Sequence, residues 1–164
     1  MTSEPRRNAL KQLAAIGLST FSGGIRDLRA AASTNDLIRN ENAKPGTREW
    51  MLASPRIDAT TKYRSPWIEG YCSHASIQAG ETISFHVSCN PTSEFNIDIY
   101  RLGYYGGNGG RHVHSLGPFK GTTQPDPPIG EKRLRYCEWN ACAELRIPAD
   151  WVSGVYLGKL TAVR

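Results

Sequence analysis

The chain has 164 residues, which is enough for one ordinary domain and an appendage. Apolar residues make up 39% of it, and 16 glycines with 10 prolines are typical of a turn-rich β-domain rather than a helical bundle. The formal net charge is +5, of which residues 1–32 contribute +3 through five basic and two acidic residues. The rest of the chain therefore carries +2, and it contains no run of basic residues interleaved with aromatic residues. This pattern argues against nucleic-acid binding.

Residues 1–32 resemble a twin-arginine export signal. Arg6 and Arg7 precede a mostly apolar run of small residues at 13–21, and Ala30–Ala32 offers a cleavage site. The apolar run is far shorter than the ~20 residues needed to span a bilayer, so no membrane anchor is expected after cleavage. This interpretation predicts a periplasmic or secreted protein. The alternative is a short amphipathic helix at the terminus of a cytoplasmic protein.

Residues 33–65 show little periodicity and contain several breakers, including Pro45-Gly46 and Pro55. We expect this segment to be an extended linker that runs over the surface of the following domain. Trp50 and Leu52 are the expected points of attachment.

From residue 66 onward, short strand-like segments alternate with turn signals. In residues 82–89, for example, Ile83, Phe85 and Val87 lie on one face, while residues 118–130 are expected to be irregular. The expected strands are at residues 67–71, 76–78, 82–89, 95–100, 111–116, 134–137, 143–147 and 154–163. This spacing predicts an all-β fold, an immunoglobulin-like antiparallel β-sandwich over residues 66–164.

The last expected strand bears on whether the sandwich is complete. Residues 150–156 resemble the turn into a tyrosine corner, in which a Tyr near the start of a late strand bonds back to the chain. In the immunoglobulin order, strand 154–163 is then the penultimate strand. We therefore expect the sandwich to be incomplete at the C-terminus, with an unpaired edge and with Val155 and Leu157 partly open to water.

The stretch Phe95–Arg111 joins a strand to a glycine-rich loop. The strand alternates apolar and polar residues, and the loop Gly103–Gly110 contains five glycines, which favours a tight, shaped turn. A dinucleotide-binding turn would need GxGxxG opening a helix, and a P-loop would end in Gly-Lys-Ser/Thr. Neither pattern follows, so nucleotide binding is not expected.

The histidines give weak signals for chemistry. His112 and His114 would place two imidazoles on one side of a strand, but no further ligand lies at a matching position, and Arg111 would disfavour a cation. A surface strand is therefore favoured over a metal site. A catalytic Ser-His-Asp set stays possible, but no local motif indicates which serine, histidine and aspartate would form it. No pair of carboxylates suggests an acid/base couple.

The four cysteines suggest two disulfide bonds. If residues 67–78 and 82–90 form a hairpin about Gly80-Glu81, Cys72 lies opposite Cys89. Cys137 and Cys142 would face each other across a tight turn. The alternative is four free thiols.

Five stretches occur together in one order: Glu41-Asn42 with Pro45-Gly46-Thr47 and Trp50, Ile68–Tyr71, Tyr100–Gly107, Cys137-Glu138-Trp139, and Trp151–Leu157. Together they resemble the N-terminal, immunoglobulin-like part of the N,N-dimethylformamidase large (beta) subunit family, over about residues 40–164. The resemblance implies structural roles for the residues of its central motifs: Tyr100, Arg101, Gly103, Tyr104, Tyr105, Gly106, Gly107, Trp151, Gly154 and Tyr156. Tyr104 and Tyr105 are expected to pack and to shape the loop.

Members of that family are amidohydrolases that cleave formamides to formate and an amine. Their iron centre is held by tyrosine and glutamate side chains in a larger domain that follows the sandwich. The resemblance implies that this chain is a non-catalytic region that lacks the iron-dependent catalytic domain, and no catalytic, cofactor-binding or metal-binding residue is assigned in it. Its implied partner is the catalytic domain or subunit of the same enzyme. The alternative is a free-standing exported sandwich that binds a carbohydrate or a protein through Gly103–Gly110 and exposed aromatic residues.

Overall fold

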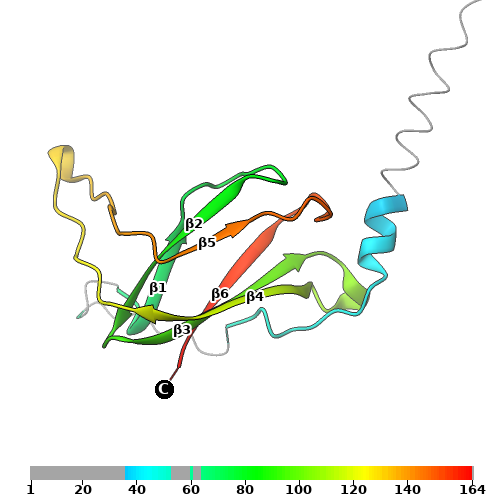
Figure 1. Ribbon diagram of the computed structural model, residues 1–164, viewed down its shortest axis with the longest axis horizontal. Coiled ribbons are helices and arrows are strands. Elements are labelled where there is room, and N and C mark those ends of the chain that lie inside the picture. Colours follow the sequence, from blue (N-terminus) through cyan, green and yellow to red (C-terminus); the bar gives the residue numbers. More distant parts are fainter. Residues whose placement is uncertain (1–35, 53–59, 61–63, 164) are drawn as a thin grey trace, which may run out of the picture. The chain divides into compact units, whose positions relative to one another are not determined.

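A computed structural model describes residues 36–52, 60 and 64–163 (Figure 1). The expected export signal, with Arg6 and Arg7, lies outside these residues. The chain divides into two units, residues 1–40 and 41–164, and the sandwich belongs to the second. None of the helices in the described segments is long and apolar enough to cross a membrane.

Within the described residues, six antiparallel strands form two three-stranded sheets. The first sheet contains β1 (Trp67–Cys72), β2 (Thr82–Asn90) and β5 (Ala143–Arg146), in the order β1-β2-β5. The second contains β3 (Ser93–Leu102), β4 (Gly110–Gly121) and β6 (Tyr156–Ala162), in the order β4-β3-β6. The short 3₁₀ turns η2 (Tyr105–Gly107) and η3 (Glu131–Arg133) lie outside the sheets. The expected all-β antiparallel sandwich is confirmed.

The core lies between the inner faces of the two sheets. Because successive strand residues point to opposite faces, every second residue of β2 and β3 enters the core. The buried core residues are Phe85, Val87 and Cys89 of β2, Phe95, Ile97 and Ile99 of β3, and Ala143 and Leu145 of β5. The alternation expected for residues 82–89 is thus confirmed.

Two expected strands are absent and one is longer than expected. Residues 76–78 and 134–137 do not form strands; Leu134 and Tyr136 are 67% and 70% exposed, so the apolar alternation there does not face a core. By contrast, β4 continues through Pro118 into the segment expected to be irregular. A bulge at Gly117 and Pro118 places both residues opposite Asn96, so the ladder tolerates a residue without an N–H group.

The segment before the sandwich is not uniformly extended. Residues 36–42 are helical, and Asp36 and Arg39 form an i,i+3 ion pair that favours this conformation. Within the second unit, Trp50 is an attachment point as expected, because its Nε1–H donates to the carbonyl oxygen of Asn108 at 3.1 Å. The prediction for Leu52 is wrong, since this side chain is 63% exposed.

The tyrosine corner is present. The hydroxyl of Tyr156 donates to the carbonyl oxygen of Val152 at 2.6 Å, and the ring of Tyr156 stacks on Trp151 with centroids 4.8 Å apart. β6 follows this corner and pairs with β3 along one edge. Among the described residues, no strand pairs with the other edge of β6. Val155 and Leu157 are 62% and 39% exposed.

The cysteine pairings are not formed. The hairpin of β1 and β2 exists, but its register places Cys72 opposite Phe85 and Cys89 opposite Ile68. The argument for a Cys72–Cys89 bond is wrong because the connection between the strands spans residues 73–81, rather than turning tightly at Gly80-Glu81. The pairing expected for Cys137 and Cys142 fails too, because residues 137–142 are not the turn of a hairpin. All four cysteines are free.

Candidate functional site: a buried network around the glycine-rich turn

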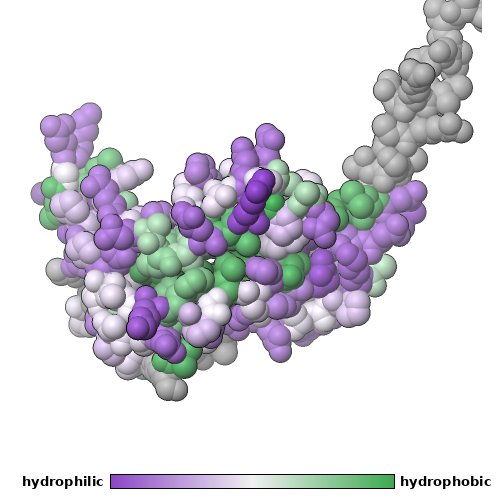
Figure 2. Space-filling model, in the orientation of Figure 1, coloured by the Kyte–Doolittle hydropathy of each residue, from purple (hydrophilic) through white to green (hydrophobic). Residues whose placement is uncertain are grey.

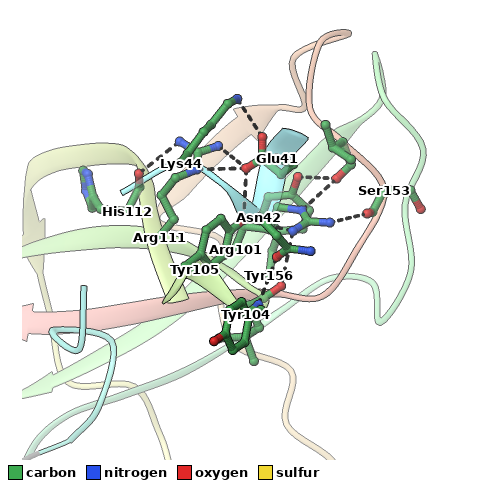
Figure 3. A network of polar contacts seen from close by, with 12 residues as sticks. Glu41, Asn42, Lys44, Arg101, Tyr104, Tyr105, Arg111, His112, Ser153 and Tyr156 are labelled. Atoms are coloured by element: carbon green, nitrogen blue, oxygen red, sulfur yellow. Dashed lines mark hydrogen bonds and ion pairs between the residues drawn. The ribbon is translucent and has the colours of Figure 1, made fainter. Parts of the chain in front are cut away.

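Glu41 is the centre of a polar network that joins the segment before the sandwich to the β3–β4 connection (Figure 3). Its side chain is only 2% exposed. Carboxylate oxygen Oε1 accepts hydrogen bonds from Nε and Nη2 of Arg111 at 2.8 and 2.6 Å, and from the hydroxyl of Tyr105 at 3.0 Å. The other oxygen, Oε2, accepts from Nζ of Lys44 at 2.6 Å. Two cations therefore compensate one buried carboxylate.

Arg101 extends the network to the β5–β6 connection. Its guanidinium group donates through Nη1 to the Tyr105 hydroxyl at 2.9 Å, through Nη2 to the carbonyl oxygen of Ser153 at 2.8 Å, and through Nε to that of Val152 at 3.3 Å. The Val152 oxygen is also the acceptor of the tyrosine corner. Arg101 is 4% exposed and carries its charge into the interior from β3. One side chain thus ties β3, the glycine-rich turn and the β5–β6 connection together.

The glycine-rich turn takes the shape that its sequence predicts. Gly106, Gly107 and Gly109 have φ values of 64°, 88° and 80°, in the region that glycine favours. Gly103 is needed for a different reason: a Cβ atom there would collide with Oδ1 of Asn42, which accepts a hydrogen bond from the Tyr104 N–H at 2.9 Å. The turn is therefore fitted closely against the preceding segment.

Trp50 closes the other side of the turn. Besides its bond to Asn108, its ring lies against Gly109 and Gly110, where a Cβ on Gly110 would come within 2.5 Å of the ring. The Thr47 N–H donates to the carbonyl oxygen of Gly110 at 2.8 Å. Residues 41–50 thus bind the turn by backbone, aromatic and ionic contacts.

The electrostatics of the network favour its ionised form. Burial alone would raise the pKa of Glu41, but the hydrogen bonds from Lys44, Arg111 and Tyr105 outweigh it and lower the pKa to about 2. The pKa of Arg111 is raised by its bonds to Glu41 and Tyr105, against the opposing effect of burial. In the described part of the chain, every buried side-chain nitrogen or oxygen has a hydrogen-bond partner.

The predictions for the two tyrosines have different outcomes. Tyr105 is 1% exposed and packs as expected, while its hydroxyl joins the network. Tyr104 is 71% exposed, so only its backbone contributes to the shape of the loop. The partners Glu41 and Arg111 were not predicted, since a carboxylate in an expected linker has no periodicity that marks it as buried. The only sequence signal was Glu41-Asn42 in the shared series of motifs.

Two further motifs meet on the outer face of the first sheet. Trp139 is 9% exposed, and its backbone N–H donates to the hydroxyl of Tyr71 at 3.1 Å. The ring of Tyr71 stacks on His86 at 4.7 Å, and Nδ1 of His86 lies 2.7 Å from the carbonyl oxygen of Trp139. These contacts hold the connection before β5 against β1 and β2.

His112 and His114 do not share a face. Tyr100 pairs with His112 and Ile99 with His114, so Val113 is an extra residue in a β-bulge. His112 consequently lies beside Tyr100, with ring centroids 5.3 Å apart, whereas His114 lies 6.4 Å from the ring of Trp151. The sequence-based placement on one side is wrong because a bulge reverses the alternation. Across the described residues, no three His, Cys, Asp or Glu side chains are grouped to hold a metal ion.

A Ser-His-Asp group does form on β3 and β4, but its hydrogen bonds do not activate the serine. Ser115 donates its hydroxyl proton to Asp98 at 2.7 Å and lies 2.9 Å from Nε2 of His112. Asp98 is also 3.5 Å from that same ring nitrogen, so it does not orient the imidazole from its far side. The arrangement is a polar surface cluster.

The network also does not fit an iron centre. Tyr105 and Glu41 are the residue types that hold iron in the family that the sequence resembles, and their oxygens lie 3.0 Å apart. However, Arg101, Arg111 and Lys44 already donate to these oxygens. A metal cation among three cationic side chains would be repelled. The arrangement therefore supports a structural role: it holds the glycine-rich turn in place.

Comparison with known protein families gives a match to part of the chain. Residues 96–164 match the family model described as N,N-dimethylformamidase beta subunit-like, C-terminal. No curated protein and no solved structure matches the chain. The matched model carries the word C-terminal, so the expectation that this is the family's N-terminal part is not confirmed. Residues 96–164 contain β4, β5, β6, the glycine-rich turn and most of β3, and this part of the chain is similar to the N,N-dimethylformamidase beta subunit-like family.

Proposed function

We propose that this chain is a non-catalytic β-sandwich region of an N,N-dimethylformamidase-like amidohydrolase. It works beside a catalytic domain or subunit of the same enzyme, which holds the iron. The observation that carries the proposal is the use of the motif residues Arg101 and Tyr105: both are buried, and their polar atoms are bonded to other parts of the sandwich. Groups used in this way support a fold and do not meet a substrate.

The proposal is tested by activity and by association. The purified chain, supplied with ferrous or ferric iron, is expected to hydrolyse no N,N-dimethylformamide. A tagged chain recovered from its native host is expected to bring with it an iron-containing polypeptide, and that complex is expected to release formate. Turnover by the isolated chain that is lost in Tyr105→Phe, with the fold intact by circular dichroism, would overturn the proposal.

A second function rests on Tyr104. This side chain is 71% exposed, and it lies on the turn that the network holds in place. An exposed aromatic residue on a fixed turn is suited to contact a carbohydrate or a protein, which favours a free-standing binding module. Binding of glycans or of a non-enzymatic partner that is lost in Tyr104→Ala would favour this alternative. Unchanged partner association in the same variant would exclude it.

We also propose that the protein is exported through the twin-arginine route. The support is the order of Arg6-Arg7, apolar run and Ala30–Ala32 in the sequence.

A further inference from the structure

A groove opens between the two sheets beside β6. It has a volume of about 580 Å³, and its lining comes mainly from β2, β5, β6 and the connections at residues 74–79 and 151–155, with Cys72 of β1 and Ile99 of β3. Apolar residues dominate the lining, among them Ile83, Leu145, Ile147 and Val155. In the view of Figure 2, hydrophobic surface gathers in a hollow of the face that carries β5 and β6.

The outer edge of β6, with which no strand of the described residues pairs, lies at the same place. Leu102 donates its N–H to Val155, and Val163 donates its N–H to Glu94, so the odd-numbered residues of β6 point their polar groups toward β3. The even-numbered residues Tyr156, Gly158, Leu160 and Ala162 therefore point theirs outward. Their side chains face the core, since Gly158 is paired with Ile99 and Leu160 with Ile97.

From this coincidence of groove and edge, we infer that β6 accepts an additional antiparallel strand from the catalytic polypeptide. The inference rests on the proposed function for the identity of the donor. Residues of the incoming strand opposite Tyr156, Gly158 and Leu160 would bond to β6 through their backbone and turn their side chains inward. The residue opposite Gly158 meets no side chain, so it has room to be large.

The charge of the groove defines the chemistry of the donor. Among the described lining residues there is no Asp, Glu, Lys or Arg. The single charged residue of β6, Lys159, faces the outer side and donates to the carbonyl oxygen of Glu49 at 2.6 Å. An incoming strand therefore needs uncharged, bulky apolar residues at alternate positions. Charges at those positions would be buried without partners.

A second copy of this chain fits the groove poorly. Its β6 would present Tyr156, Gly158 and Ala162 inward at the shared edge. Tyr156 is already held by Val152 and Trp151, and the other two side chains are too small to fill the space. A strand with a sequence other than that of β6 would therefore fill the groove better.

The test uses the full-length chain and a designed nine-residue peptide, Thr-Val-Thr-Phe-Thr-Val-Thr-Val-Thr. Binding is measured by calorimetry, with two N-methylated forms of the peptide as controls. Methylation of the apolar residues removes the N–H groups that face β6 and should weaken binding at least tenfold. Methylation of alternate threonines blocks the opposite edge and should leave binding unchanged.

The matched variants of the protein are Gly158→Pro and Gly158→Ala. The proline removes an outward N–H without touching the ladder to β3, and should weaken peptide binding at least tenfold with the fold retained. Alanine keeps the N–H, and its Cβ would lie 3.5 to 3.7 Å from Ile97, Ile99 and Phe85, which is ordinary contact. It should bind normally.

Three results with the isolated chain, and a fourth with the co-purified complex, would overturn the inference. The first is the absence of peptide binding to the full-length chain. The second is equal weakening by both methylated peptides. The third is a dimer of the chain that Gly158→Pro dissociates and the peptide does not. Failure of the proposed function is distinguishable: the peptide would bind as expected, but the co-purified complex would not release formate. If that complex forms normally with Gly158→Pro and is active, the edge is not its docking site and the proposed function stands.

Discussion

At the scale of residues, the decisive fact is that a glutamate from the segment before the sandwich is buried among an arginine, a lysine and a tyrosine. The four side chains belong to parts of the chain up to 70 residues apart. Removing Arg111 or Tyr105 leaves the buried Glu41 carboxylate with less compensation, which costs more than the pair's net contribution to stability. Glu41 is therefore a structural residue with an electrostatic signature.

That signature can be measured through the pH dependence of stability. The pKa of Glu41 is about 2 in the folded chain, against 4.5 for an ordinary glutamate. Because the folded value is the lower one, ionised Glu41 stabilises the protein fully above about pH 4.5, and this contribution disappears as the pH falls toward 2. The contribution of ionised Glu41 to the free energy of unfolding is about 3 kcal/mol. Urea unfolding between pH 7 and pH 2 should show this difference between the wild type and Glu41→Gln.

Glu49→Gln is the matched control, because the Glu49 side chain is exposed in the same segment. It should follow the wild type at every pH. If the stability of Glu41→Gln instead changes with pH in the same way as that of the wild type, the ion pairs of Glu41 do not contribute to the stability of the fold.

The cysteines give a second prediction at this scale. Cys89 is fully buried, and burial raises the pKa of its thiol, whereas Cys72 is exposed. In a pulse of iodoacetamide on the native protein, Cys72 should be labelled within minutes and Cys89 only as fast as the chain unfolds. Mass mapping with and without urea checks this. Rapid native labelling of Cys89, or a Cys72–Cys89 disulfide in the map, would contradict the observed register.

At the scale of elements, the sequence predicted the strands whose apolar residues alternate in a buried sheet. Residues 82–89 and 95–100 have this pattern, and both became long central strands. The pattern failed where exposed apolar residues imitate it, as at Leu134 and Tyr136, and where a bulge interrupts it, as at Val113. Register also escaped prediction, since it depends on the length of the connection and on packing against the facing sheet.

The bulge in β4 can be tested at Gly117. This residue has a φ of 114°, and a Cβ there would lie 2.9 Å from the carbonyl oxygen of Phe95. Gly117→Ala should therefore combine backbone strain with overpacking and destabilise the protein by about 2–4 kcal/mol. Gly80→Ala is the control: its φ is 89°, but no atom lies within 4 Å. It should cost about 1–2 kcal/mol in the same urea experiment. Equal effects would show that the contact with Phe95 is not limiting.

At the scale of the whole molecule, the sandwich is held by three connections as much as by its core. The glycine-rich turn, the β5–β6 connection and residues 41–50 meet in the Glu41 network, and the family motifs lie mainly at these meeting points. The sequence showed these motifs in order but not their contacts, because no periodicity relates Glu41 to Arg111 or Arg101 to Ser153. Long-range polar pairing is visible only once the strands are placed.

Export is the prediction that concerns the whole chain. If Arg6 and Arg7 form a twin-arginine signal, changing both to lysine should retain the protein in the cytoplasm at its precursor length. Cell fractionation followed by mass measurement of the chain checks this. Export of the double variant with cleavage near Ala32 would instead indicate the general secretory route.

The distance in sequence between residues 41–50 and their contact partners sets an order of events during synthesis. Lys159, which bonds to Glu49, follows it by 110 residues. At about 5–20 residues per second, Glu49 emerges from the ribosome roughly 5–20 s before its partner. The direct partners of Glu41 and Trp50 lie no later than Arg111 and emerge earlier, so residues 41–50 can be held first by the glycine-rich turn and last by Lys159. A released chain that is truncated before residue 152 should leave residues 41–50 open to proteases, and the chain that includes β6 should protect them.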